Sequence, residues 1–466
     1  MTSPEAPQVS WTSSRRQAVV IGAGLGGLTA ARALADHFQQ VVVVERDQLP
    51  ADAHQRAGIP QGRHAHALLG GGQRALDELF PGFSEDLHRA GAVPYRVGLE
   101  NRMERPGFDP FPARDLGWVG YAMSRPLIEL VVRRRLVERA NVSIRSRCRA
   151  ASPLASDDGS AVVGVRCEGP SGPAEVIDAD LVVDASGRGA PTLTMLETLG
   201  RPAPVETSIG ADFGYASAVF EVPGDASPEW KVCFTFPSAP QASRGGLLMP
   251  LEGGRWILSL AGRGNDKPPG DLPGLLEFAR SLRTQTIHRA IARARPLGDV
   301  VRFGLPASVH RHFDRGPGLP RGLLPFADAI CRFNPIYGQG MTVAAQEACL
   351  LGRLLRDGVE PLGPAFLDGA DRVIESPWAL SAVPDLVYPD TVGVRPPDFE
   401  RRVAFGVALN RLAAQDPAVH RLTIEVQHLL KPRSVLLEPE LVRRVQELAS
   451  AEAGSGGSAS ARAGAS

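Results

Sequence analysis

Three glycines near the start of the chain have the spacing of a dinucleotide-binding turn. Gly22, Gly24 and Gly27 fit GxGxxG within the run GAGLGG at residues 22–27. The first glycine permits a tight turn, the second lets backbone approach a pyrophosphate, and the third lets a helix pack closely on a strand. Glu45 follows 18 residues after Gly27, where it would accept hydrogen bonds from ribose hydroxyls. The pattern predicts a dinucleotide site.

Two later turns could also bring backbone close to a bound group. Asp184 ends an apolar run and is followed by Gly187 in the sequence DASGRG. Asp328 follows another apolar run, and Gly338 and Gly340 then precede a segment typical of a helix. Free N–H groups at a helix N-terminus favour negative charge, so the last turn suits a group that becomes anionic. Taken singly, each of these turns would also fit an ordinary loop.

The elements that must position these turns follow a strand, helix, strand order. Apolar residues 18–21 precede the first glycine turn, a helix is expected over 28–38, and a second apolar run occupies 41–44. This order is typical of a βαβ unit. Further on we expect a helix over 127–137, strands over 142–145, 161–166 and 181–184, short strands with turns between about 210 and 262, helices over 275–282 and 287–294, and mostly helix after 361.

Composition excludes several classes of protein. The 51 Lys and Arg residues balance 51 Asp and Glu residues, so nucleic acid and anionic membrane surfaces are not expected as main partners. No apolar stretch of about 18 residues occurs, and no apolar segment precedes the arginines near the start. We therefore expect a cytoplasmic protein with no obligatory membrane contact.

Two weaker patterns carry less information. Gly70-Gly71-Gly72 before Ala75 fits GxGxxA, but no convincing strand precedes it, and we interpret it as a turn entering a helix over 73–79. The pair His64 and His66 has no third ligand nearby in the sequence, and the five cysteines form no CxxC pair. The sequence therefore predicts no metal site.

Five segments, taken together in their order along the chain, give the chain its family likeness. They are GAGLGG with Glu45, RAGIPQGRHAHALL at 56–69, SRPLIELVVRRRL at 124–136, VDASGRGAP at 183–191 and FADAICRFNPIYGQGMTVAAQEA at 326–348. On these segments the chain resembles the para-hydroxybenzoate hydroxylase-like FAD-dependent monooxygenases. Within that group it is most similar to the bacterial polyether-type epoxidases. The resemblance spans most of residues 17–355.

The resemblance implies that FAD binds in an extended form. The first glycine turn would hold the pyrophosphate and Glu45 the ribose, while Arg125 would lie near the pyrophosphate or ribityl chain. Asp328 would bond a ribityl hydroxyl, and residues 338–341 would offer backbone N–H groups to the isoalloxazine. The expected cofactor-binding residues are Gly22, Ala23, Gly24, Gly27, Glu45, Arg46, Arg125, Asp184, Gly187, Asp328, Gly338, Gly340 and Met341. The segment containing His64 and His66 would either line the access channel or make structural hydrogen bonds.

The chain departs from the wider family's pattern in three places. Ala327 stands where a glycine usually precedes Asp328, and we expect it to crowd the backbone near the flavin. The histidine often found after that aspartate is missing, with Arg332 and Phe333 in its region. Met341-Thr342 replaces the usual asparagine after Gly-Gln-Gly. The aspartate and both late glycines remain, so FAD is still expected to bind.

The resemblance also implies a fold of mixed α/β class, a Rossmann-like FAD-binding domain with an inserted antiparallel β-sheet domain and C-terminal helices. The expected parts are a flexible N-terminus at 1–16, a discontinuous FAD-binding domain at 17–200 and 297–360, a substrate-binding β domain at 201–296, a C-terminal helical region at 361–450 and a disordered tail at 451–466. The β domain should cover the flavin with apolar residues. We expect half of these apolar candidates to be plain core, because only one face of a strand can face the pocket. The candidates are Phe220, Phe234, Phe236, Leu247, Met249, Trp256 and Leu258.

In enzymes of this group NAD(P)H reduces the flavin, O2 adds at its C4a carbon, and one oxygen atom of the hydroperoxide passes to the substrate. The resemblance thus implies epoxidation or hydroxylation of a hydrophobic small molecule, as in natural-product biosynthesis, since no Arg or Lys cluster stands out in the β domain. We name no catalytic side chain, because the difficult chemistry belongs to the cofactor. No second nucleotide motif appears, so NAD(P)H would dock transiently or a separate flavin reductase would deliver electrons.

Two alternatives stay open. One is a flavin-dependent reductase or dehydrogenase of a hydrophobic alkene, although the tryptophan-rich motif of such enzymes is missing. The other is a degenerate protein that binds FAD without turnover. This alternative stays open because Ala327 replaces the usual glycine. A halogenase is less favoured because no WxWxIP motif occurs in the expected place.

Overall fold

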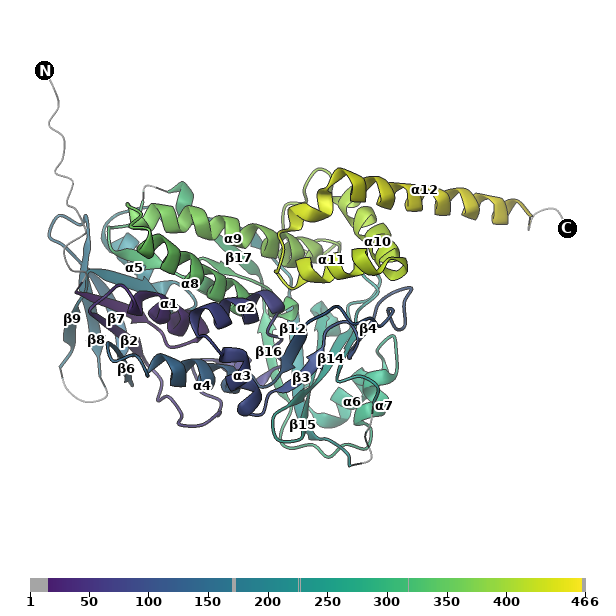
Figure 1. Cartoon of the computed structure of the whole chain (residues 1–466), viewed down its shortest axis with the longest axis horizontal. Helices are drawn as coiled ribbons and strands as arrows, with labels where there is room; N and C mark the ends of the chain where they lie inside the picture. Colours follow the sequence, from purple (N-terminus) through teal and green to yellow (C-terminus); the bar gives the residue numbers. More distant parts are fainter. Residues whose placement is uncertain (1–15, 170–172, 225, 227, 317, 463–466) are drawn as a thin grey trace, which may run out of the picture.

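A parallel sheet of five strands forms the first layer of the molecule (Figure 1). The computed structural model describes residues 16–169, 173–224, 226, 228–316 and 318–462. The strand order is β18-β10-β1-β2-β6, and each neighbouring pair is parallel. The strands are β1 Gln17–Ile21, β2 Gln40–Glu45, β6 Val142–Ser146, β10 Leu181–Asp184 and β18 Leu323–Pro325. The chain moves from β1 to one side through β2 and β6 and then crosses to β10, so the order reverses at β1. Ligands of open α/β sheets bind at such a reversal.

The sheet is covered on both faces, as its near-continuous runs of valine require. Val20 packs on one face with the helices α1 Leu25–Ala35 and α8 Gly340–Arg356. Val19 packs on the other face against a small antiparallel sheet. That sheet consists of β7 Arg149–Ala155, β8 Val162–Glu168 and β9 Glu175–Asp178. The expected α/β fold class is confirmed, although α1 begins at Leu25, inside the glycine run, rather than at residue 28.

A six-stranded sheet forms the second layer. Its order is β16-β12-β15-β14-β13-β4, and its pairs are antiparallel except β13 with β4. The strands are β4 Asn101–Glu104, β12 Phe213–Glu221, β13 Val232–Thr235, β14 Gly245–Leu251, β15 Arg255–Arg263 and β16 Val301–Leu305. The pairing therefore departs from the expected range 201–296 at both ends, because β4 and β16 supply the two edge strands. β11 Val205–Ile209 lies inside that range but pairs elsewhere, with β17 Ser308–His312. The division into domains stays a prediction.

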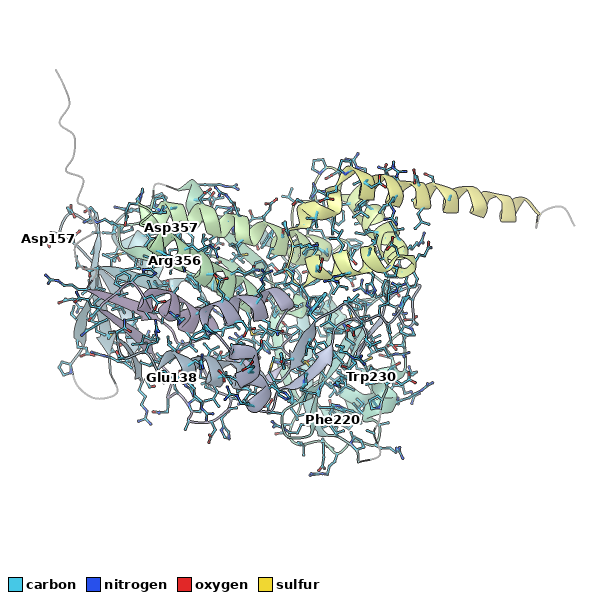
Figure 2. The ribbon with its side chains drawn as sticks, in the orientation of Figure 1. Glu138, Asp157, Phe220, Trp230, Arg356 and Asp357 are labelled. Carbon is cyan, nitrogen blue, oxygen red and sulfur yellow. The ribbon has the colours of Figure 1, made fainter. Side chains whose placement is uncertain are left out.

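The two faces of this second sheet have different surroundings. One face packs on the helices α6 Leu272–Arg280 and α7 Thr286–Ile291 and includes Phe220, with Trp230 packed against the same core (Figure 2). Of the expected apolar candidates, those in this helix-covered core are Phe220, Trp256 and Leu258, and those in the cluster on the opposite face are Phe234, Leu247 and Met249. Successive strand residues alternate between faces, which explains the division.

Three helices of the C-terminal part pack into a core that also includes Phe111: α10 Phe399–Gln415, α11 Pro417–Gln427 and α12 Pro439–Arg462. α9 Leu362–Asp385 precedes them, and its residues Phe366 and Ile374 lie in the core shared with α1 and α8. α12 projects from the molecule (Figure 1) and runs through 451–462, where the sequence predicted a flexible tail. No proline interrupts this stretch, and extending an existing helix is far easier than nucleating one. Residues 463–466, and residues 1–15 of the expected flexible N-terminus, lie outside the described residues.

Other elements connect these layers. They are α2 Gly70–Leu79, α3 Phe83–Arg89, α4 Arg125–Leu136, α5 Ala190–Thr198, β3 Val93–Arg96, β5 Val119–Ala122 and β19 Cys331–Arg332, with short 3-10 turns between them. The three glycines at 70–72 lie inside α2, not in a turn before it as expected. A Cβ on Gly71 would lie 2.4 Å from the carbonyl oxygen of Leu429, so glycine lets the C-terminal part approach α2. Among the described helices, none is both long and apolar enough to cross a bilayer.

Candidate functional site

The loops that follow three parallel strands meet at one edge of the first sheet. Ile21 is in register with Asp184, and Asp184 with Pro325, so the strands end side by side. A Cβ on Gly22 would lie 2.7 Å from the carbonyl oxygen of Ala185. The structure thus brings the first glycine turn and the turn after β10 into direct contact, at the point where the strand order reverses.

The turn after β18 completes this arrangement. A Cβ on Gly26 would lie 3.0 Å from the Cβ of Ala327, and a Cβ on Gly340 would lie 3.6 Å from Asp328 Oδ1. Asp328 therefore sits between the beginning of α8 and the glycine turn that opens α1. Segments more than 300 residues apart in the sequence therefore meet at this edge of the sheet.

The backbone packing of the protein requires two of the three glycines in the first motif, but it does not require the third. Gly22 has φ +100°, a conformation that side chains disfavour, and a Cβ on Gly27 would lie 1.8 Å from the carbonyl oxygen of Gly22. The fold therefore requires both. A Cβ on Gly24 would meet no described atom closer than Ile59 Cδ1 at 3.8 Å. Packing does not explain this glycine, whereas the close approach of a pyrophosphate would.

Two helix N-termini at this edge lack side-chain caps. Neither Gly24 before α1 nor Gln339 before α8 makes a capping hydrogen bond. The buried Gln339 Oε1 and Thr342 Oγ1 also have no partner among the described residues. Uncapped N-termini present N–H groups and partial positive charge, so they suit a phosphate at α1 and a polar or anionic ring edge at α8.

Glu45 lies at the end of β2 in a buried network of charges. Its Oε2 accepts the Ala23 N–H at 2.8 Å and lies 3.1 Å from Arg56 Nη1. Arg56 also lies 2.9 Å from Asp47 Oδ2 and 3.5 Å from Glu129 Oε2. Burial lowers the pKa of Arg56, but the three carboxylates outweigh burial and raise it. A ribose would share Glu45 with Arg56, which the site prediction omitted although Arg56 opens the second family segment.

Arg125 and Asp328 face a common space. Arg125 begins α4, where Ser124 Oγ caps the helix, and its guanidinium lies 2.8 Å from Glu129 Oε1. Burial raises the pKa of Asp328, and the charges of Arg125 and Arg332 oppose that shift. Burial and Arg125 together lower the pKa of His66 to about 3, so this imidazole is neutral at physiological pH. The expected placement of Arg125 near the same cofactor as Asp328 is consistent with this geometry and stays a prediction.

Four more expected cofactor residues differ in their surroundings. Asp184 is fully buried, and its carboxylate accepts the Thr192 N–H at 2.9 Å, the Thr192 hydroxyl at 2.7 Å and the Ser186 N–H at 3.1 Å. We therefore revise its role from cofactor contact to holding the loop that contains Gly187. Gly187 has φ +88° and open space around its Cβ position. Arg46 is exposed, and the side chain of Met341 lies in the helical core, which leaves only its backbone for a ligand.

The segment that contains His64 docks on the open face of the second sheet. His64 Nδ1 lies 2.7 Å from Ser217 Oγ, and the Ala65 N–H donates to Ser259 Oγ at 2.9 Å. The His64 ring also packs edge-on against Tyr215, with centroids 5.3 Å apart. The buried His64 Nε2 and Tyr215 hydroxyl lack partners within the described part of the chain. One imidazole nitrogen is therefore structural, and the other is available to a ligand.

A buried polar network ties the glycine turn at 334–341 to this sheet. Asp385 accepts hydrogen bonds from Asn334 Nδ2 at 3.0 Å and from the Tyr337 hydroxyl at 2.9 Å. Arg263, at the end of β15, lies 3.9 Å from Asp385 and stacks over Tyr388 at 4.4 Å. Burial raises the pKa of Asp385, against the effect of these partners. Sequence reasoning missed this network because no motif surrounds Asp385 or Arg263.

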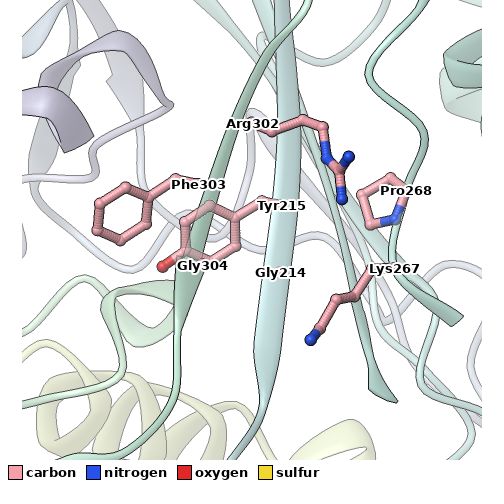
Figure 3. A pocket seen from close by; sticks show the side chains of 7 residues that line it. All are labelled: Gly214, Tyr215, Lys267, Pro268, Arg302, Phe303 and Gly304. Atoms are coloured by element: carbon pink, nitrogen blue, oxygen red, sulfur yellow. The ribbon is translucent and has the colours of Figure 1, made fainter. Parts of the chain in front are cut away.

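A hollow of about 320 Å³ lies at the β12 and β16 edge of the sheet. Figure 3 shows Phe303 and Tyr215 on one side of the paired strands and Arg302, Lys267 and Pro268 on the other. The rings of Tyr215 and Phe303 are stacked 5.7 Å apart at 14°. Two basic side chains, Arg302 and Lys267, line this hollow, and the expectation of no Arg or Lys cluster in the β domain stays a prediction. The ammonium of Lys267 is paired with Asp212 at 2.5 Å.

Ala327 adopts a left-handed conformation, with φ +54°. A Cβ disfavours this region by roughly 1–2 kcal/mol, so glycine would adopt the same backbone conformation with less strain. We expect Ala327→Gly to raise the free energy of unfolding by about 1 kcal/mol, measured by urea denaturation of the FAD-loaded protein.

Ala329 in the same 3-10 turn provides the matched control, since its φ is not positive. We expect Ala329→Gly to destabilise by about 0.5–1 kcal/mol through the entropy of the unfolded chain. If both substitutions destabilise equally, Ala327 is not strained.

The fold and the edge site define a dinucleotide-binding flavoprotein. A model of the FAD binding domain family matches residues 15–363, and the chain belongs to that family. It is 37% identical over 387 residues to Protein Rv3254 of Mycobacterium tuberculosis (strain ATCC 25618 / H37Rv), and the match covers 80% of each chain. The expected FAD-binding class is thus confirmed, whereas the likeness to polyether-type epoxidases stays a prediction.

Solved structures share this fold at low identity. The flavin-dependent brominase Bmp2 superposes with a TM-score of 0.65 at 16% identity, over 93% of this chain and 99% of that one. PqsL, a probable FAD-dependent monooxygenase from Pseudomonas aeruginosa, has a TM-score of 0.57 at 18% identity, over 80% and 96%. At such identities the likeness is one of fold.

Proposed function

We propose that this protein is an FAD-dependent monooxygenase that transfers one oxygen atom from O2 to a largely hydrophobic small molecule by epoxidation or hydroxylation. The observation that carries the proposal lies where the segment 64–67 docks on the open face of the six-stranded sheet, beside the turn that contains Gly338. There the buried His64 Nε2 and Tyr215 hydroxyl, both without partners among the described residues, stand beside apolar side chains. A mostly apolar wall with a few unsatisfied polar groups is typical of a small-molecule site.

The residues present fit FAD. The open Cβ position of Gly24 and the uncapped start of α1 would hold the pyrophosphate, with Ala23 beside it. Glu45 would bond the ribose and Asp328 a ribityl hydroxyl. The backbone of 338–341, at the uncapped start of α8, would donate to the isoalloxazine. Gly187 would leave room for backbone approach, and Arg125 would lie near the pyrophosphate or ribityl chain.

When bound, FAD supplies the activation of O2 and the oxygen transfer, with NAD(P)H as the expected reductant. The chain's own residues orient the reactants and exclude water. Asp385 accepts hydrogen bonds from Asn334 and Tyr337, and these bonds fix the turn that would face the flavin ring. Tyr215 and Phe303 form a stacked aromatic pair against which a planar or polyene substrate could lie. His64 Nε2 and the Tyr215 hydroxyl would form hydrogen bonds with two polar atoms of the substrate.

An oxygen-transfer assay tests the function. The FAD-loaded protein would be reduced anaerobically with NADPH, NADH or a separate flavin reductase and then exposed to ¹⁸O₂ with a panel of polyenes, terpenoids and polycyclic phenols. We expect substrate-dependent consumption of O2 and one ¹⁸O atom in the product, detected by mass spectrometry.

Other results would favour other activities. Loss of a carbon–carbon double bond without ¹⁸O would indicate an alkene reductase or dehydrogenase, and bromination or chlorination in the presence of halide would indicate a halogenase. Stoichiometric FAD binding with no reduction by any electron donor would indicate a protein without turnover. Each of these three outcomes contradicts the proposed monooxygenase.

A further inference from the structure

A second cluster of polar side chains lies away from the edge site, where β17 packs against α9. It contains His310 and His312 on β17 and Asp371 on α9. One ring nitrogen from each histidine and one carboxylate oxygen lie within 4.8 Å of one another. The distance from His310 Nε2 to Asp371 Oδ1 is 3.3 Å. Two imidazoles and a carboxylate are a donor set that divalent transition metals prefer.

Strand geometry explains why the two histidines meet. Residues two apart on a strand lie on the same face, so His310 and His312 project together toward α9. Their ring centroids are 4.2 Å apart, and His310 also lies 5.7 Å from the Trp378 ring of α9. Both histidines are more than nine-tenths buried, whereas Asp371 is half-buried. The carboxylate can therefore move toward the rings more easily than the rings can move.

One ring nitrogen of His312 forms a hydrogen bond, and the other has no partner among the described residues. Its Nε2 lies 2.7 Å from Thr207 Oγ1 on the neighbouring strand β11. Its buried Nδ1 has no hydrogen-bond partner in the described chain, and the nearest carboxylate oxygen, Asp314 Oδ1, is 4.0 Å away. When Nε2 donates its proton to the Thr207 hydroxyl, Nδ1 carries the lone pair that a metal requires, and metal-binding histidines are commonly held in this way. An ordinary hydrogen-bonding histidine would not leave a buried nitrogen unused.

We propose that His310, His312 and Asp371 bind one divalent transition-metal ion of the zinc type. Zinc bonds of about 2.0–2.2 Å place neighbouring ligand atoms roughly 3.4 Å apart in a tetrahedron, close to the separation already present between His310 and Asp371. A modest movement of the Asp371 side chain would bring in His312. Asp314 or water would complete the fourth position.

The position of the site indicates a structural role. β17 pairs with β19, so that His310 is in register with Cys331, three residues after Asp328. α9 ends at Asp385, which holds Asn334 and Tyr337 of the glycine turn. An ion that joins β17 to α9 would tie together two elements that support the edge site, without touching the site itself. The sequence predicted no metal because Asp371 stands 59 residues beyond His312.

Metal binding can be measured on the full-length, FAD-loaded protein. After treatment with EDTA and its removal, the protein is dialysed against Zn²⁺ at about 100 µM and its metal content is measured by mass spectrometry. We expect one equivalent of zinc, a rise in Tm of about 3–6 °C, and Co²⁺ absorption bands at wavelengths beyond those of the flavin. His312→Gln and Asp371→Asn should each abolish the stoichiometric zinc and the rise in Tm.

Asp368→Asn is the matched control, because Asp368 is an exposed carboxylate on the same helix that pairs with Arg372. It should bind zinc like the unaltered protein. Asp371→Asn changes a half-buried surface group, so it decides the question even if His312→Gln does not fold. The proposal is overturned if the unaltered protein retains no zinc after dialysis, or if Asp371→Asn binds as much zinc as Asp368→Asn.

Discussion

Replacing Gly24 with alanine is expected to raise the dissociation constant for FAD by at least ~100-fold, equivalent to about 2.7 kcal/mol, while leaving the protein folded. The extra methyl group meets no described protein atom closer than 3.8 Å. It would instead occupy the space through which backbone approaches the pyrophosphate. Gly24 also has φ −71°, which alanine adopts without strain. The affinity can be measured by titrating apoprotein with FAD and following the quenching of flavin fluorescence.

Gly352 on α8 provides a matched control. A Cβ at Gly352 would have its nearest contact, with Ala33 Cβ, also at 3.8 Å, but Gly352 lies three helical turns away from the start of α8. Gly352→Ala should leave FAD affinity unchanged and stabilise the helix by roughly 0.5–1 kcal/mol. Equal losses of affinity in the two variants would mean that Gly24→Ala acts through the fold rather than through the pyrophosphate. Unchanged affinity in Gly24→Ala would exclude the proposed pyrophosphate position.

Local patterns predicted the parts of the site that depend on backbone. A glycine turn between a buried strand and a helix has few alternatives, and the shared edge of parallel strands then brings residues 22–27, 185–187 and 326–328 together. The motif also indicated that Gly24 serves a ligand, and the open space around its Cβ position supports that interpretation. Such features follow from the neighbours of each residue in the sequence.

Tertiary partners could not be predicted in the same way. Three features of the site depend on which elements pack together. Arg56 competes for Glu45, the Asp184 carboxylate bonds within its own loop, and Asp385 bonds to residues 334–337. The pairing of β4 with β13 joins residues about 130 positions apart, so periodicity within either strand could not reveal it. Burial itself is a tertiary property, and it governs the charge of the carboxyl group discussed next.

Glu347 is expected to make the protein less stable as pH rises from about 4.5 to about 8. The side chain is fully buried on α8, and burial, helped by the nearby Asp328, raises its pKa to about 8 although its bond from the Ala327 N–H opposes the shift. The folded protein thus keeps this proton in a range where the unfolded chain, with a pKa near 4.5, has lost it. Since the folded state keeps this proton, the contribution of Glu347 to stability is fully present below pH 4.5 and falls by about 3–5 kcal/mol as the pH rises to about 8.

Glu347→Gln should remove this dependence, because glutamine resembles the protonated acid and can still accept the Ala327 N–H. Between pH 5 and pH 8, the apparent free energy of unfolding in urea should fall by roughly 3 kcal/mol less in Glu347→Gln than in the unaltered protein. Glu78→Gln on α2 removes an exposed carboxylate that pairs with Arg353 at 3.6 Å, and it should leave the pH dependence as it is. Parallel pH profiles for all three proteins would show that Glu347 is ionised in the folded state and that its charge is balanced by groups around the cofactor edge. A profile flattened in Glu347→Gln alone would establish a neutral carboxylic acid beside Asp328, next to the turn that would hold the ribityl chain.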